Sequence, residues 1–284
     1  MQQEGKENRI EQREWRNKEM TILALAKPAE SVKRENYLIK ALMVGKSGSG
    51  KTTSAGLTLP KPILVLDYDN RAESLAGAEG IDVIKLLPTA TDVMAWRKVT
   101  ELEAELWGQV RKKTLKYKSI LEAGLSAMNR MAMYYAMLAN PARGFGGGAT
   151  QGHYGVQIKN LQDHIMTMLA LPVNYVLEAH YELVEDQESG MTTFLPLLFG
   201  KKARSELPGM FNECYHAFHA SDNKEKRERY YWHTSGFGRF DFMKSSLNNP
   251  AGKYWTDPIE INLTEQVTGF QKLLELRFGK GGEK

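Results

Sequence analysis

Residues 38–53 read LIKALMVGKSGSGKTT, and the rest of the chain is best interpreted from this stretch outward. The apolar run that ends at Val44 predicts a buried β-strand. It leads directly into a pattern of Gly, four free positions and Gly-Lys-Ser/Thr, which is typical of a phosphate-binding loop. Glycines at 45, 48 and 50 permit the backbone to turn successive N–H groups inward around an anion. The sequence therefore predicts a strand, a phosphate-binding loop and a helix that begins near Lys51.

Each part of this loop has a role in holding a nucleotide. Lys51 can reach the β and γ phosphates, and the Thr52 hydroxyl can bind Mg²⁺. The predicted helix directs the positive end of its dipole at the same anion. The alternative is a Gly/Ser-rich turn that fits the pattern by chance, but the strand before it and the helix after it favour nucleotide binding. The predicted ligands are ATP and Mg²⁺, and the predicted binding residues are Gly45, Lys46, Ser47, Gly48, Ser49, Gly50, Lys51, Thr52 and Thr53.

The composition fits one α/β domain with appendages. Of the 284 residues 42% are hydrophobic, and the net charge of +4 is too small to establish nucleic-acid binding. Apolar runs stay below the ~18 residues that span a bilayer, and the first residues lack an apolar signal region. Cys214 is the single cysteine, which excludes an intrachain disulfide and a cysteine zinc site. We expect a cytoplasmic protein without membrane contact.

Strands and helices alternate after the loop. The expected strands lie at 63–69, 81–84, 120–126, 173–180 and 210–220, and the expected helices at 71–78, 91–110, 128–138, 156–171 and 264–278. This order predicts an α/β fold with a mostly parallel central sheet, helices on both faces and antiparallel strands at the C-terminal side. Asp67 and Asp69 end the second strand, at the edge where open α/β sheets bind ligands. Turn formation or helix capping is the alternative role for either acid.

Three further segments bear on function. The glycine-rich residues 141–155 predict a functional loop, and the acidic residues 182–189 a loop or exposed hairpin. Residues 227–241 alternate arginines with aromatic side chains and predict a hairpin with its turn at Ser235-Gly236. Such a ribbon could stack bases and hold phosphates, or it could be an ordinary half-buried ribbon. We divide the chain into a charged arm and lead-in at 1–36, a core at 37–262, and a C-terminal helix and tail at 263–284.

The order of these signals, over about residues 22–262, resembles the RecA-like ATPases. The likeness is to the compact P-loop proteins of phages, whose members include single-strand annealing recombinases. This resemblance implies a RecA-like core, single-stranded DNA binding, strand annealing and action as a homo-oligomer in the host cytoplasm. It also implies a single-strand-binding protein as a partner.

The resemblance assigns roles to three residues outside the loop. Leu66-Asp67-Tyr68-Asp69 is similar to the second-strand motif that holds the water-activating acid, which places Asp69 in that catalytic role. His180 ends the strand where the family has a polar residue that senses the γ phosphate and relays ATP state to the DNA loops. Lys244 matches the first lysine of a stretch that reaches the nucleotide of a neighbouring subunit, whereas Ser246 departs from its second basic position. With Lys51, these are the candidate catalytic residues.

The chain departs from the family at the metal-associated aspartate. Aligning residues 124–128 with the family places Ala123 at that position, and Glu122 is the only nearby carboxylate. Thr52 and Glu122 are therefore the candidate metal ligands. Because side chains alternate along a strand, Glu122 would face the wrong side of the sheet unless the strand is shifted or bulged. Metal binding could instead rest on Thr52 and the phosphates, with Asp67 or Glu122 acting through water, and ATP hydrolysis would then be weak or absent.

Three functions remain open from the sequence. The leading hypothesis is an ATP-binding recombination protein that binds single-stranded DNA and promotes annealing, with ATP hydrolysis coupled to DNA binding or assembly. A second is a P-loop ATPase for DNA packaging or replication. A third is a nucleotide-gated assembly protein without significant catalysis, which Ala123 favours. The fold alone does not choose among these functions.

Overall fold

A computed structural model describes residues 28, 33, 37–89, 92, 94–139, 147–185, 190, 192–222, 227–248, 252–263 and 268–279. Contacts divide the chain into two units, Met1–Tyr37 and Leu38–Lys284. The predicted arm and lead-in lie outside the described residues, apart from positions 28 and 33. The same holds for residues 141–146 of the glycine-rich segment and for residues 186–189 of the acidic segment.

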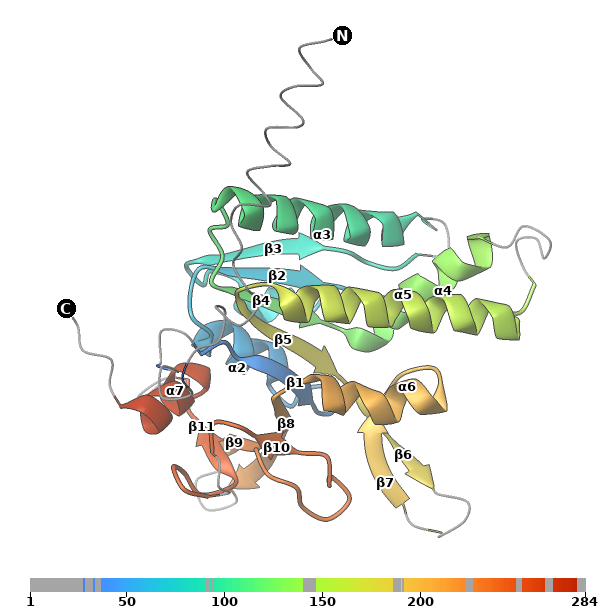
Figure 1. Cartoon of the computed structure of the whole chain (residues 1–284). Helices are drawn as coiled ribbons and strands as arrows, with labels where there is room; N and C mark the ends of the chain where they lie inside the picture. Colours follow the sequence, from blue (N-terminus) through green and yellow to red (C-terminus); the bar gives the residue numbers. More distant parts are fainter. Residues whose placement is uncertain are drawn as a thin grey trace, which may run out of the picture. The chain divides into compact units, whose positions relative to one another are not determined.

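In the described part of the second unit, a nine-stranded sheet forms the centre, in the order β11-β9-β8-β1-β5-β4-β2-β3 with β10 paired to β8 (Figure 1). The strands are β1 (Lys40–Val44), β2 (Ile63–Asp67), β3 (Ile81–Lys85), β4 (Ser119–Ala123), β5 (Asn174–Ala179), β8 (Glu213–Asp222), β9 (Arg227–His233), β10 (Lys244–Ser245) and β11 (Ile259–Ile261). The run from β3 to β8 is parallel, and β9, β10 and β11 pair antiparallel. A separate hairpin of β6 (Tyr181–Glu185) and β7 (Thr192–Pro196) follows β5.

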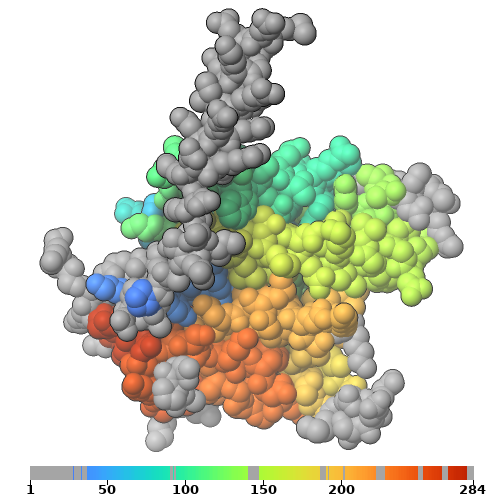
Figure 2. All heavy atoms as spheres, in the orientation of Figure 1, coloured from blue at the N-terminus to red at the C-terminus, as the bar shows by residue number. Residues whose placement is uncertain are grey.

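Helices cover both faces of the sheet. They are α2 (Lys51–Thr58), α3 (Ala95–Lys112), α4 (Leu125–Ala139), α5 (Gln151–Ala170), α6 (Lys201–Glu206) and α7 (Phe270–Phe278), with short 3-10 turns at Ala72–Leu75 and Leu207–Met210. Helices α3, α4 and α5 pack together on one face, and α3 and α5 lie side by side in the space-filling view (Figure 2). On the other face α2 meets α7, where the Phe270 amide donates to the Thr58 hydroxyl at 3.1 Å.

Burial on both faces explains why the strands read as continuous apolar runs. In β1, Leu42 and Val44 join the core beneath α3, α4 and α5. The alternate residues Ala41 and Met43 are equally buried, with 0% exposure. Strand residues of one parity therefore face the α3–α5 layer and those of the other parity face α2. The same parity separates Glu122 of β4 from Glu178 of β5.

The structure confirms the predicted fold class and corrects several boundaries. The expected helix at 71–78 is only a short 3-10 turn, because Ala76 leaves the helical region with ψ at 132° and Gly77 follows with a left-handed φ of 79°. Helix α5 begins at Gln151, so the C-terminal part of the predicted glycine-rich loop is helical, with Thr150 and His153 forming a capping box.

The basic-aromatic segment also differs from its prediction. Strand β9 pairs with β8 and β11 and does not fold back at Ser235-Gly236. Trp232 in this strand is 1% exposed and packs on Phe270 of α7, with 4.8 Å between the ring centroids. The segment therefore forms a half-buried ribbon, and its contact with nucleic acid stays a prediction. Among the described helices, none has the length and apolarity needed to cross a membrane.

Candidate nucleotide-binding site

The loop between β1 and α2 has the backbone shape that its glycines permit. Gly48 and Gly50 have φ angles of 80° and 78°, in the left-handed region that favours glycine. At Gly45, an added Cβ would lie 2.5 Å from the Ala217 carbonyl oxygen, so β8 leaves no room for a side chain. At Gly50, it would lie 2.8 Å from the Tyr230 ring. The loop is therefore held against β8 and β9 in a form that suits glycine.

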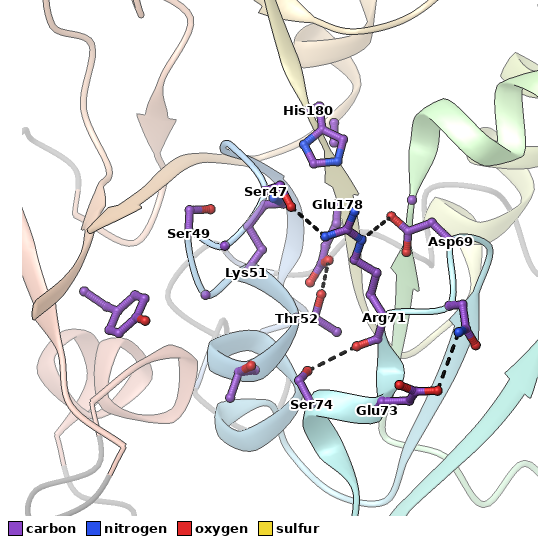
Figure 3. A pocket seen from close by; sticks show the side chains of 17 residues that line it. Ser47, Ser49, Lys51, Thr52, Asp69, Arg71, Glu73, Ser74, Glu178 and His180 are labelled. Carbon is purple, nitrogen blue, oxygen red and sulfur yellow. Dashed lines mark hydrogen bonds and ion pairs between the residues drawn. The ribbon is translucent and has the colours of Figure 1, made fainter. Parts of the chain in front are cut away.

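The loop forms one wall of a cavity of about 550 Å³, a size that suits a cofactor-sized ligand (Figure 3). Residues that follow several strand ends meet there. The lining consists of Ser47, Gly48, Ser49, Gly50, Lys51, Thr52, Thr53, Asp69, Asn70, Arg71, Glu73, Ser74, Gly124, Glu178, Ala179, His180 and Tyr230. The structure thus brings Asp69 and His180 together with the loop.

Lys51 opens helix α2 and is 8% exposed. Its ammonium group donates to the carbonyl oxygens of Gly45 and Lys46, at 2.9 Å each. Burial lowers the pKa of Lys51, while nearby Glu178 opposes that shift. Phosphate oxygens form stronger, charge-assisted hydrogen bonds than neutral carbonyls do. A nucleotide entering the cavity would therefore offer Lys51 a better partner than the loop itself.

Thr52 is bonded to an acid that sequence reasoning did not select. Its hydroxyl donates to Glu178 Oε2 at 2.7 Å. Glu178 is 3% exposed, and its other oxygen, Oε1, has no hydrogen-bond partner. Burial raises the pKa of Glu178 to about 7, opposed by the Thr52 hydrogen bond and by Lys51. Glu178 lies two residues before His180, so the alternation of side chains along β5 is the signal that could have identified it.

Asp69 faces the loop from just beyond β2 and is paired with Arg71, a residue that the sequence analysis also missed. Arg71 Nε lies 3.3 Å from Asp69 Oδ2, and its guanidinium donates to the Ser47 hydroxyl at 2.6 Å (Figure 3). Asp69 Oδ1 is buried without a partner. Burial raises the pKa of Asp69, and Arg71 opposes that rise. A Cβ at position 124 would lie 3.0 Å from Asp69 Cγ, so Gly124 leaves space for this carboxylate.

Asp67 forms a turn, which the sequence analysis gave as the alternative to a role at the ligand edge of the sheet. Its carboxylate accepts hydrogen bonds from the backbone N–H groups of Asp69 at 3.3 Å, Arg71 at 3.0 Å and Ala72 at 3.0 Å. The side chain is fully buried and does not line the cavity. Asp67 therefore shapes the turn that presents Asp69.

His180 links the loop to the hairpin beyond it. Its Nδ1 lies 3.0 Å from the Gly45 carbonyl oxygen, which requires Nδ1 to donate. Burial and the charge of Lys51 lower the pKa of His180, which keeps the ring neutral at pH 7. The next residue, Tyr181, begins β6.

The structure corrects the assignment of Glu122 as a metal ligand. Strand β4 pairs with β2 and β5 in unbroken register, so no bulge turns Glu122 toward the loop. Its carboxylate lies beneath α3 and α5, where it contacts Tyr175 at 2.7 Å, His164 at 2.8 Å and Tyr68 at 3.4 Å. Strand parity is the physical reason, because Glu122 and Ala123 point to opposite faces.

Lys244 lies outside this cavity. It is exposed on β10, opposite Cys214 of β8, and does not line the cavity of its own chain. Within the described residues, no group of three His, Cys, Asp or Glu side chains is arranged to hold a metal ion. Nucleotide-bound Mg²⁺ needs only one or two protein groups beside phosphate oxygens and water. Thr52 and Glu178 have the chemistry for that smaller set.

Comparisons with known proteins assign the family. The profile of a family described as "AAA domain" matches residues 38–237. No curated protein matches the chain. Among solved structures, a KaiC-like protein from the hyperthermophilic archaeon Pyrococcus horikoshii OT3 is similar, with 11% identity and a TM-score of 0.34. That similarity covers 70% of this chain and 80% of the archaeal one.

Proposed function

The chain belongs to this AAA domain family, and we propose that it binds and hydrolyses ATP with Mg²⁺ in order to act on single-stranded DNA. Membership of a P-loop ATPase family supports the binding of ATP. The observation that carries hydrolysis is the position of Asp69, which lines one cavity with Lys51 and Thr52 and has a buried oxygen without a partner. A carboxylate placed there can orient a water molecule toward the γ phosphate and take its proton.

Each protein group has a part in this reaction. Lys51 and the N-terminus of α2 stabilise the charge that develops on the phosphate oxygens. Thr52 would hold Mg²⁺, which would supply further charge neutralisation when bound. Water attacks the γ phosphorus while the bond to the bridging oxygen breaks, and Asp69 accepts the proton of the water. Arg71 is paired with Asp69 in this structure, and a γ phosphate would compete for that guanidinium. ATP binding would thereby release Asp69 for its role.

Coupling to DNA is supported by His180 and the hairpin that it adjoins. His180 contacts the loop at Gly45, and its own carbonyl oxygen accepts from the Leu197 amide at 2.7 Å, just beyond β7. A shift of the loop on ATP binding would therefore reach both ends of the β6–β7 hairpin through one residue. This arrangement suits the sensing role that the family resemblance implies for His180.

An exposed aromatic pair beside the hairpin supports binding of single strands. Tyr154 of α5 and Phe199, which follows β7, are 39% and 46% exposed. Their rings meet edge to face, with centroids 6.0 Å apart. Exposed aromatic faces stack unpaired bases with little dependence on sequence. We propose that this pair contacts the bases, as in a single-strand annealing recombinase of the phage type.

Binding of labelled single and double strands with ADP, ATP and a nonhydrolysable ATP analogue, across a range of salt concentrations, tests the proposal. We expect single strands to bind more tightly with the ATP analogue and to lose affinity as salt rises. Phe199→Ala should weaken binding roughly 5–100-fold, the usual effect of removing one base stack. The matched control is Met166→Ala, which removes an exposed apolar side chain further along α5. Equal binding of single and double strands, unaffected by nucleotide, would contradict the proposal.

A second candidate is a nucleotide-gated assembly protein, favoured by the absence of a carboxylate at position 123.

For either function, we propose that the chain forms homo-oligomers in which Lys244 reaches the nucleotide of a neighbouring subunit. Lys244→Ala should keep ATP binding but lose ATP-dependent assembly in sedimentation. Mixing it with Lys51→Ala should restore some composite sites. Parent-like assembly and turnover of Lys244→Ala would remove this role.

A further inference from the structure

The sheet carries one row of residues on the face of the nucleotide loop, across three neighbouring strands. Ala123 of β4 is in register with Asp67 of β2 on one side and with Glu178 of β5 on the other. Partners in register on parallel strands point to the same face, so all three side chains face the α2 side. Asp67 is committed to backbone N–H groups and Ala123 has no polar side-chain atom. Glu178 is therefore the acid of this row that remains available to a ligand.

We propose that Glu178 holds the nucleotide-bound Mg²⁺ together with Thr52, in place of the carboxylate that position 123 lacks. The acid is relocated by one strand, from β4 to the neighbouring register position on β5. This inference rests on the proposed function, because it assigns the metal-holding residue of the same ATP site. It departs from the expectation that Glu122 or Asp67 serves this role.

The hydrogen bonding of Glu178 suits a cation ligand. Thr52 donates to Oε2, and Oε1 is buried with no partner, on a side chain that lines the cavity (Figure 3). A buried carboxylate oxygen without a hydrogen bond is costly, and native structures usually satisfy such atoms with a ligand or an ordered water. A cation held between Glu178, Thr52 and phosphate oxygens would satisfy Oε1 and neutralise the charge.

The other nearby acids are engaged elsewhere. Glu122 lies on the opposite face with two tyrosines and His164. Asp69 is paired with Arg71 through Oδ2, and the proposed function assigns its unpartnered Oδ1 to the attacking water. Glu73 lines the cavity but is exposed and pairs with Lys85 at 3.7 Å. Of the carboxylates in the described residues, Glu178 is the one bonded to the Thr52 hydroxyl.

The test is the gain in nucleotide affinity that Mg²⁺ confers, measured by calorimetry with a nonhydrolysable ATP analogue in Mg²⁺ and in EDTA. This readout does not depend on turnover. In the parent, we expect Mg²⁺ to tighten binding. In Glu178→Gln, affinity in EDTA should match the parent or exceed it, whereas the gain from Mg²⁺ should fall roughly 10–100-fold, as expected for loss of one charged ligand. Glu73→Gln removes the same charge from the same cavity and should keep the full gain.

The outcomes separate this inference from the proposed function. A full Mg²⁺ gain in Glu178→Gln would overturn the inference and leave ATP binding intact. A parent that binds no ATP in either condition would overturn both. If Glu178→Gln does not fold, Glu178→Asp provides the test, because it keeps the charge but draws the carboxylate back by one methylene. We expect Glu178→Asp to lose much of the Mg²⁺ gain with unchanged affinity in EDTA, and an unchanged gain would overturn the inference.

Discussion

Two buried glutamates on adjacent strands face opposite sides of the sheet and have different surroundings. Glu122 is 0% exposed and Glu178 is 3% exposed, so burial does not distinguish them. Their partners do. The Glu122 carboxylate contacts two tyrosines and His164, beneath the α3–α5 layer. Glu178 has one oxygen on Thr52 and no hydrogen bond to the other. A buried carboxylate whose two oxygens both have hydrogen-bond partners stabilises the fold, whereas one with an unpartnered oxygen can bind a ligand.

The Glu122 side of the sheet contains a complete charged network. His164 also contacts Glu103 of α3. Burial alone would lower the pKa of His164, but the two glutamates raise it to about 10, so the ring is charged at pH 7. Trp96 packs against the ring edge, with centroids 5.8 Å apart. The network connects α3 and α5 to β4. Both oxygens of the Glu122 carboxylate have partners within it.

The largest effect that we expect comes from the same contrast in a second pair of acids, Asp67 and Asp69. Asp69→Asn should slow ATP turnover roughly 10²–10⁴-fold, because it removes the proton acceptor. Asp67→Asn should instead lower the free energy of unfolding, because three backbone N–H groups lose a charged acceptor. Single-turnover hydrolysis and urea denaturation of both variants measure the two effects. Unchanged turnover in folded Asp69→Asn would remove Asp69 from the mechanism.

The next effect compares the two glutamates directly. Glu122→Gln should lower the free energy of unfolding by about 3–5 kcal/mol, because it leaves the buried charge of His164 with a single counter-ion. Glu178→Gln should change that free energy little, since it removes a charge that the nucleotide-free protein satisfies only in part. Urea denaturation without nucleotide measures both. Equal destabilisation by the two substitutions would break the distinction between structural and functional acid.

Two lysines, Lys40 at the start of β1 and Lys51 at the start of α2, sharpen the comparison further. Lys51 donates to two loop carbonyls, and Lys40 donates to the carbonyls of Leu171 and Val173 at 2.7 Å each. Lys51→Ala should weaken ATP binding roughly 10–100-fold and leave the fold intact, because a charged hydrogen bond to phosphate is lost. Lys40→Ala, the control, should lower stability and spare ATP affinity. Calorimetry and urea denaturation measure the two, and unchanged ATP affinity in folded Lys51→Ala would contradict the site itself.

The last comparison concerns pH and the His164 network. The folded pKa of about 10 lies above the ordinary 6.5, so this pairing contributes stability fully below pH 6.5 and loses it as pH rises through 10. Tyr68 and Tyr175, which face the same network, have pKa values raised by burial and by Glu122, so they stay neutral over this range. Stability measured from pH 6 to pH 10 should fall less steeply in His164→Gln than in the parent. Parallel profiles would show that His164 is uncharged in the fold.

The sequence predicted the parts of the molecule that depend on local pattern. The strand, loop and helix at 38–58 followed from apolar periodicity and glycine spacing, and strand parity correctly placed Glu122 on the wrong face in the absence of a bulge. Asp69 could be singled out because it follows a strand end at the ligand edge of the sheet, whereas His180 was assigned by the family resemblance.

The remaining features depend on contacts between distant segments. Side-chain alternation before His180 indicates only the face of Glu178, whereas its proposed role as a ligand depends on its register with Ala123 and its bond to Thr52, which lies far from it in the sequence. Arg71 was missed because the turn that presents it depends on Asp67 acting as a backbone acceptor. The pairing of β9 with β8 and β11 could not be separated from a local hairpin, since both satisfy the same alternation of side chains.

The most direct test of the proposed metal ligand is to remove the carboxylate at position 178 and to place one at position 123. The measurement is the Mg²⁺-dependent gain in affinity for a nonhydrolysable ATP analogue in Glu178→Thr and in the double variant Ala123→Asp/Glu178→Thr. We predict that Glu178→Thr loses the gain and that the double variant recovers most of it, because an aspartate at 123 lies in the same row on the same face. A folded double variant that binds the analogue in EDTA but gains nothing from Mg²⁺, or a Glu178→Thr protein with the full gain, would contradict the relocation of the acid.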